Sequence, residues 1–280
     1  MTSICVETPR RRLYLLVQED TGLNCVKAVV LSLCLVSPGT LTARQSNQTA
    51  PKTEAPSTNL TPEEVIRAFS AKESEFFEAW MQYSYRQTAA IRILSVNGLN
   101  RTEGMKIVSE VYFRDDGSRD VRVVEHTGQL RSVGWTREDT EVINNIQPFA
   151  LTSKDLPLYD LKYEGKEKVD ELECYVFSVK PKKTRGDKLY FQGKIFVDDR
   201  DLQIVRTVGK PVPQRRENQF PEFETIRQVI DDQYWFPVWT HALSTLHFDR
   251  QTIRVEETIT YEDYKRFGSK AKIEYGAPKP

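Results

Sequence analysis

The second half of the chain alternates between apolar and polar positions over a series of short segments. Apolar residues recur at every second position in Leu172–Lys180, Leu189–Val197 and Ile253–Tyr261. Successive side chains of a strand point to opposite faces of a sheet. The pattern therefore predicts antiparallel strands with one apolar face and one more polar face.

One long helix is predicted in front of the strands. Thr61 and Glu64 match a capping box, and Pro62 suits the first turn. An apolar stripe with several aromatic residues then continues to about Trp80. The region from Thr136 to Tyr159 is the least β-like, and short helices are expected to start at Thr136 and Thr152. Strands are predicted at Tyr83–Val96, Met105–Arg114, Arg119–His126, Asp160–Val169, Leu172–Lys180, Lys188–Asp198, Gln203–Lys210, Glu222–Asp231, Tyr234–Phe248 and Thr252–Tyr264.

This order of elements predicts an α+β fold that is mainly antiparallel β. About ten consecutive strands favour a strongly curved, half-open barrel. Such a sheet must bury its apolar concave face, and the N-terminal helix is the natural cover. We predict one β domain over residues 61–267 and a polar tail over residues 268–280.

The N-terminal region resembles an export signal. An apolar run at residues 28–36 follows Lys27 and precedes small residues near a cleavage position after Ala43, which is the order of a secretory signal peptide. The run is too short to span a bilayer, which takes roughly 20 residues. The sequence therefore predicts a periplasmic or secreted protein with a cleavable signal.

The residues before this run fit a signal poorly because Glu7 and Glu19 are acidic. We therefore predict that residues 1–43 comprise an N-terminal extension and the signal, with the true translation start near Val26. Residues 44–60 are rich in polar residues and proline, and this composition predicts a flexible linker.

Charge and cysteine content exclude some classes of function. Lys+Arg and Asp+Glu both number 40, so the chain lacks the basic excess of a nucleic-acid-binding domain. Of four cysteines, only Cys174 follows the predicted signal, so no intramolecular disulfide is expected after cleavage. Cys174 is predicted to be a small buried hydrophobe on the strand face opposite Phe177.

No arrangement of residues predicts catalysis, a metal site or a cofactor. The acidic segment Asp198–Asp201 lacks the spacing of a calcium loop and is assigned to a hairpin turn. His241 and His247 are about 20 Å apart along one strand. Glu256 and Glu257 are neighbours on a strand and point to opposite faces, so they form no acid–base pair.

Two sets of residues are candidates for binding. The first set combines apolar residues expected on the concave face with helix aromatics, and it forms either an ordinary close-packed core or a ligand cavity. Its members are Phe76, Phe77, Trp80, Ile107, Val111, Phe113, Phe177, Phe191, Ile195, Val197 and Trp235. The second set is Lys182, Lys183 and Arg185 in a loop between strands. That loop is either a solvated hairpin or a contact for anionic lipid head groups or an acidic partner.

Two segments resemble the LolA-like superfamily of periplasmic lipoprotein carriers and RseB-type stress regulators. One is the hairpin Leu189–Arg206, with Val-Asp-Asp at its turn and Leu-Gln-Ile-Val after it, and the other is Tyr234-Trp235-Phe236-Pro237. The resemblance spans about residues 62–267. It implies a half-open antiparallel barrel, capped by helices, with a cavity for acyl chains. In carrier members an arginine holds the lid closed, and the motifs here indicate no position for it.

Two functions follow from this resemblance. The first is an exported, non-enzymatic protein that binds lipid or lipoprotein acyl chains in an apolar cavity. Binding of this kind depends on buried apolar area, at roughly 25 cal/mol per Å², so no polar triad is expected. The alternative is an RseB-like sensor or interaction module that recognises a membrane-anchored protein and transports no cargo.

Overall fold

The protein is described here by a computed structural model that covers residues 60–114 and 116–266. The predicted extension, signal peptide, linker and polar tail lie outside the described residues, apart from Leu60 at the end of the linker. The helices of the described part are α1 (Pro62–Trp80), α2 (Arg137–Glu141), the π-helix η1 (Val142–Ile146) and the 3-10 helix η2 (Leu156–Leu158). The strands are β1 (Tyr83–Val96), β2 (Leu99–Phe113), β3 (Arg119–Gln129), β4 (Tyr159–Val169), β5 (Leu172–Pro181), β6 (Tyr190–Asp198), β7 (Ile204–Val212), β8 (Phe223–Ile230), β9 (Tyr234–His247) and β10 (Thr252–Arg266).

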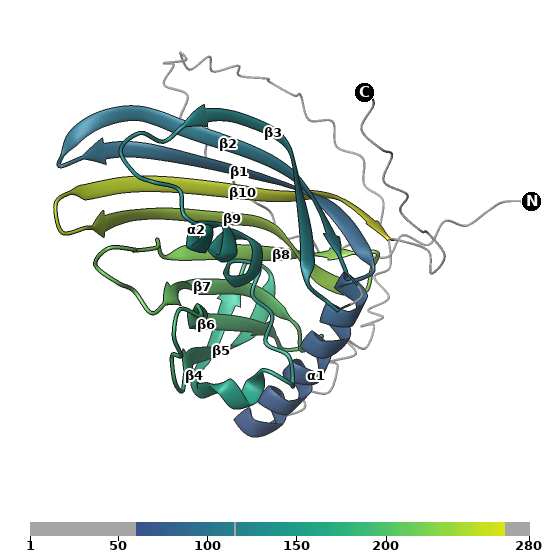
Figure 1. The fold of residues 1–280 in the computed structure, drawn as a ribbon. Coiled ribbons are helices and arrows are strands. Elements are labelled where there is room, and N and C mark those ends of the chain that lie inside the picture. The colour runs from purple at the N-terminus through teal and green to yellow at the C-terminus, as the bar shows by residue number, and fades with distance from the viewer. Residues whose placement is uncertain (1–59, 115, 267–280) are drawn as a thin grey trace, which may run out of the picture. The chain divides into compact units, whose positions relative to one another are not determined.

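All ten strands belong to one antiparallel sheet (Figure 1). Their order is β3-β2-β1-β10-β9-β8-β7-β6-β5-β4. Within the runs β1 to β3 and β4 to β10, strands adjacent in sequence are adjacent in the sheet, and the pairing of β1 with β10 joins the two runs. β3 and β4 are the two ends of the order, so the sheet is open. The predicted fold class, a half-open antiparallel sheet covered by an N-terminal helix, is confirmed.

Helix α1 begins with the predicted capping box. The Thr61 side chain accepts a hydrogen bond from Glu64 N at 3.3 Å, and the Glu64 carboxylate accepts one from Thr61 N at 2.8 Å. These contacts satisfy two of the backbone donors that a helix N-terminus leaves free. They also hold the pKa of the Glu64 carboxyl below its ordinary value.

The aromatic side of α1 packs on the concave face of the sheet. Phe69 contacts Phe177 of β5, with ring centroids 5.8 Å apart. Phe76 meets Phe236 of β9 edge-on at 5.3 Å. Trp80 is completely buried at the end of the helix. These contacts make α1 a lid over one part of the sheet, as predicted.

The opposite face of the sheet buries a second apolar cluster, which includes Cys174, Val176, Phe196, Ile226 and Trp235. Cys174 is buried and free, and burial raises the pKa of its thiol to about 12. A thiol with so high a pKa is a poor nucleophile. The prediction of a buried hydrophobe on the face opposite Phe177 is confirmed.

The connection from β3 to β4 lies against the concave face. Helix α2 starts after Thr136, as predicted, with a capping box formed by Thr136 and Asp139. The π-helix η1 follows it directly and was not predicted. At the second expected helix start, Thr152 forms a turn with Asp155, and only the 3-10 helix η2 follows. Among the described residues, no helix is long and apolar enough to cross a bilayer.

Candidate functional site: an apolar cavity near the β9–β10 hairpin

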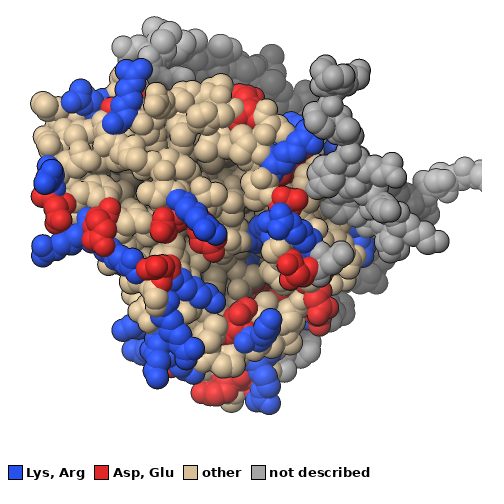
Figure 2. Space-filling view, viewed as in Figure 1, with Lys and Arg blue, Asp and Glu red and all other residues tan. Residues whose placement is uncertain are grey.

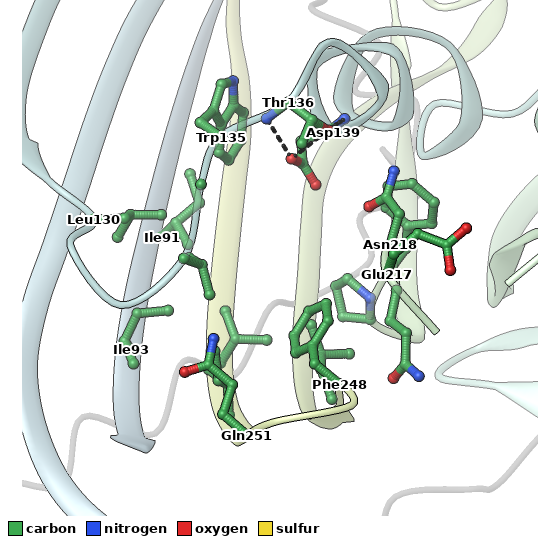
Figure 3. A pocket seen from close by; sticks show the side chains of 18 of the residues that line it. Ile91, Ile93, Leu130, Trp135, Thr136, Asp139, Glu217, Asn218, Phe248 and Gln251 are labelled. Carbon is green, nitrogen blue, oxygen red and sulfur yellow. Dashed lines mark hydrogen bonds between the residues drawn. The ribbon is translucent and has the colours of Figure 1, made fainter. Parts of the chain in front are cut away.

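A cavity of about 530 Å³ lies between β1, β9 and β10 and the segments at residues 130–142 and 216–221 (Figure 3). We call residues 130–142 the roof segment. The volume falls within the roughly 300–1,000 Å³ of small-molecule sites. The apolar lining consists of Ile91, Ile93, Leu130, Val133, Trp135, Val142, Phe220, Pro221, Leu246, Phe248, Ile253 and Val255.

One face of β10 forms the floor of the cavity, because alternate side chains of the strand point to that side. Ile253, Val255 and Glu257 are two residues apart, so they share one face of the strand, and all three line the cavity. They span about 13 Å of extended chain. Gln251 continues this row into the β9–β10 hairpin. The floor is therefore elongated along the strand.

The roof segment is fixed at its start by hydrogen bonds to the sheet. The Glu103 carboxylate of β2 accepts hydrogen bonds from the backbone N–H groups of Arg131 at 2.7 Å and Ser132 at 2.8 Å. Gln251 Nε2 donates to Ser132 O at 3.0 Å. Hydrogen bonds from the side chain and backbone of Ser132 hold the pKa of the Glu103 carboxyl below its ordinary value. The segment is thereby tied to β2 and to the β9–β10 hairpin.

Two of the carboxyl groups that line the cavity have raised pKa values. Glu257 is 6% exposed, and its carboxylate accepts a hydrogen bond from Gln147 Nε2 at 2.6 Å. Burial raises the pKa of Glu257 to about 7, and the negative charge of Asp139 acts in the same direction. Burial also raises the pKa of Asp139. The carboxyl group of Glu257 therefore titrates near neutral pH.

A buried ion pair attaches α1 to the sheet. Arg227 of β8 donates to the Glu73 carboxylate of α1 through Nη1 at 2.9 Å and Nη2 at 3.2 Å. Arg227 Nη2 also donates to the Phe149 carbonyl, and the guanidinium lies 4.8 Å from the centre of the Phe76 ring. Both members of the pair are at most 1% exposed. One arginine thus joins β8, helix α1 and the chain that follows η1.

The sequence pattern itself indicates that Glu257 and Glu73 are buried. Glu257 occupies an apolar position in the alternation of β10, between Val255 and Ile259. Glu73 likewise lies four residues after Phe69 and three before Phe76, on the apolar side of α1. A charged residue in an apolar register indicates a buried charge with a specific partner.

Most of the apolar binding candidates lie in the core and not around the cavity. Phe76, Trp80, Val111, Phe177, Phe191, Ile195 and Val197 are completely buried, and Phe77, Ile107 and Phe113 are partly buried. None of these residues lines the cavity. Phe77 borders a second hollow of about 390 Å³ beside β6.

Trp235 lies on the other face of the sheet. It packs with Cys174 and Phe196, whereas its neighbour Phe236 contacts Phe76 of the lid helix. Adjacent residues of a strand face opposite sides, so only one of the two can point toward α1. The assignment of Trp235 to the concave face is corrected to Phe236.

The basic loop candidates lie apart from the cavity. Lys182, Lys183 and Arg185 are exposed between β5 and β6, and none of them lines the cavity. Lys182 Nζ donates to the carbonyl of Pro157 at 3.0 Å. Figure 2 shows basic and acidic side chains interspersed on the face that carries the helices.

Comparison with known proteins gives structural matches only. No family model and no curated protein matches the chain. A DUF1329 family protein from Desulfovibrio piger matches with a TM-score of 0.40 and 13% identity, over 73% of this chain and 92% of that chain. The fold is similar to that of LolA superfamily proteins. A LolA superfamily protein from Nitrosomonas europaea matches with a TM-score of 0.31 and 12% identity, over 71% of this chain and 94% of that chain.

A further match is a putative outer membrane lipoprotein-sorting protein domain from Vibrio parahaemolyticus. Its TM-score is 0.36 and its identity is 11%, over 74% of this chain and 95% of that chain. These likenesses concern the fold alone. The function must therefore be argued from the cavity and its surroundings.

Proposed function

We propose that this chain binds the acyl chain of a lipid or lipoprotein in the cavity beneath the roof segment. The observation that supports this is the apolar lining of a cavity of about 530 Å³ with an elongated floor along β10. Transfer of apolar surface from water into such a site contributes roughly 25 cal/mol per Å². Binding of this kind requires no catalytic group, metal or cofactor.

The proposed setting is the periplasm or the exterior of the cell, where the protein acts in a carrier-like way. This setting rests on the signal peptide predicted within residues 1–43. The exposed basic loop with Lys182, Lys183 and Arg185 is proposed to contact anionic head groups or an acidic partner. Changing these three residues to glutamate tests the contact, and unchanged binding to anionic vesicles would reject it.

A pair of substitutions on β9 tests the cavity itself. Leu246 lines the cavity, whereas Leu243 on the same strand is 47% exposed. Leu246→Trp fills the cavity with an indole ring, so native mass spectrometry should find at least about tenfold less bound lipid than in the unmodified protein. Leu243→Trp should leave lipid binding unchanged.

Two results would reject acyl-chain binding at this site. One is a purified protein that stays empty when phospholipids and acylated peptides are offered. The other is a Leu246→Trp variant that folds normally and binds as much lipid as the Leu243→Trp control.

A second candidate function, recognition of a membrane-anchored protein, is favoured by the edge strand β3. This strand pairs with β2 and stands at one end of the sheet order. Val123 is 56% and Val124 is 43% exposed, so apolar side chains are accessible along this edge. Partner strands commonly add to exposed edges of this kind.

Site-specific crosslinking distinguishes the second candidate from the first. A photoreactive residue at position 123 should form an adduct with one membrane-anchored protein in cells. The same residue in place of Leu158, which is 44% exposed in η2, should form no such adduct. Equal labelling from both positions would argue against recognition at β3.

A further inference from the structure

We infer that the cavity selects amphiphiles whose head group donates hydrogen bonds, a hydroxyl or an ammonium, and that Glu257 is the residue that selects them. This inference rests on the proposed function, because it assumes that an apolar chain occupies the cavity. It adds the chemical class of the head group and assigns one specificity-determining residue.

The first argument is the position of Glu257 in the cavity wall. Its neighbours on the same face of β10 are Val255 and Ile259, both buried, and Glu257 itself lines the cavity. A carboxyl group in an apolar wall is costly unless polar partners compensate it. An apolar residue at this position would suffice for a site that bound only hydrocarbon.

The second argument is a surplus of hydrogen-bond acceptors around Glu257. The carboxylate accepts a bond from Gln147 Nε2 at 2.6 Å, although a carboxylate has about four acceptor positions. The Oε1 atom of the same Gln147 side chain is buried and lacks a partner among the described residues. Gln147 does not line the cavity, so a ligand group that donates hydrogen bonds would use the remaining acceptor positions of Glu257, which does.

The third argument is the charge of the lining. Asp139, Glu217, Asp249 and Glu257 contribute four carboxyl groups, whereas Arg216 and Arg250 contribute two guanidinium groups. The side chains of Arg216 and Asp249 approach to 3.9 Å, so one basic group already faces an acid. A free carboxylate head group would meet net negative charge here, while an ammonium or hydroxyl would not.

The arrangement of these residues gives the ligand a direction. Glu257 lies at the end of the β10 row farthest from the β9–β10 hairpin, and Gln251 lies at the hairpin end. Figure 3 shows Asp139 at the end of the cavity opposite Gln251 and Phe248. A head group at Glu257 would therefore place its chain over Val255 and Ile253, toward the hairpin.

The test compares three probes that share one chain length: hexadecanol, hexadecylamine and palmitate. Each displaces a fluorescent lipid from the purified full chain. The unmodified protein should bind the alcohol and the amine at least about tenfold more tightly than palmitate, because each donates to a buried carboxyl group.

Two variants separate the roles of charge and hydrogen bonding at position 257. Glu257→Gln keeps an acceptor and removes the charge, so the preference for hexadecylamine should fall while that for hexadecanol remains. Glu257→Leu removes both, so neither preference should survive. Glu262→Gln on the exposed part of β10 is the matched control and should retain both preferences.

The outcomes separate this inference from the proposed function. Failure of all three probes to bind the unmodified protein would overturn acyl-chain binding as a whole, and the inference with it. Palmitate binding as tightly as the other probes would overturn the inference alone. Unchanged preferences in Glu257→Gln would do the same, and that variant carries the test if Glu257→Leu does not fold.

Discussion

Arg227 and Glu73 form an ion pair that is enclosed on all sides by α1, the sheet and the chain after η1. Removing one partner of such a pair leaves the other as an unpaired buried charge. Arg227→Met should therefore lower the free energy of unfolding by about 3–5 kcal/mol, measured by urea denaturation.

The double variant Arg227→Met/Glu73→Met should recover much of this loss, because it removes both charges from the interior. Arg92→Met, which removes the exposed partner of Glu256 on β1 and β10, should cost at most about 1 kcal/mol. A cost for Arg227→Met as small as that of Arg92→Met would contradict the role of the pair in holding α1.

Glu257 gives the protein a predictable dependence of stability on pH. Burial raises its pKa from 4.5 to about 7 in the folded protein, so the folded state favours the protonated form. Its contribution to stability is complete below about pH 4.5 and is lost as the pH rises through about 7. Asp139 faces Glu257 from α2, and its charge adds to this effect.

Glu257→Gln should remove this dependence because the amide does not titrate. The stability of the variant relative to the unmodified protein should rise by roughly 2–3 kcal/mol between pH 4.5 and pH 8. Thermal melting across this range provides the measurement, with Glu262→Gln as the exposed control. Parallel pH profiles for the two variants would rule out Glu257 as the titrating group.

Individual site residues were harder to predict than the strands that carry them. Alternation assigns residues to faces only when the register is continuous, and β8 and β9 shift register between Ile226 and Arg227. Trp235 and Phe236 are both large and apolar, so composition does not tell which one faces α1. Glu257 occupies an apolar register between Val255 and Ile259, which indicates that it is buried but does not indicate the cavity that it lines.

At the scale of elements, the roof segment depends on few contacts, of which those made by Glu103 are central. Glu103→Ala removes the acceptor of two backbone N–H groups, at Arg131 and Ser132. Hydrogen bonds to a charged group contribute about 1.5–3 kcal/mol, so amide exchange in residues 130–142 should accelerate by about tenfold or more. Hydrogen–deuterium exchange with mass spectrometry measures this change.

Glu125→Ala is the matched control for the roof experiment. Glu125 lies on β3 and pairs with Lys106 at 3.3 Å on the surface, so its removal should leave exchange in the roof segment unchanged. The same exchange rates in Glu103→Ala and Glu125→Ala would show that other contacts hold the roof.

The elements with strong local signals were predicted well. The bounds of α1 and β1 agree with the predicted Pro62–Trp80 and Tyr83–Val96. The path of residues 130–158 depends on distant partners, such as Thr225 Oγ1, which donates to the Gln147 carbonyl at 2.9 Å. Since no local pattern encodes such contacts, the cavity beneath this segment could not be located from the sequence.

At the scale of the whole described part, the order of the sheet includes one pairing between strands that are distant in sequence. The run from β4 to β10 needs only hairpin connections, as does the run from β1 to β3. The two runs meet where β1 pairs with β10, for example at Ile91 and Glu257. Alternation predicts that both strands have a buried face but does not indicate that they are neighbours.

The pairing of β1 with β10 also determines when during folding the sheet can be completed. Synthesis from the N-terminus produces β1 first and β10 last among the ten strands. Until Thr252–Arg266 arrives, β1, β2 and β3 have no attachment to the rest of the sheet, and contacts so distant in sequence form slowly. The cavity under the roof segment, which β1 and β10 line together, is thus among the last parts of the described fold to form.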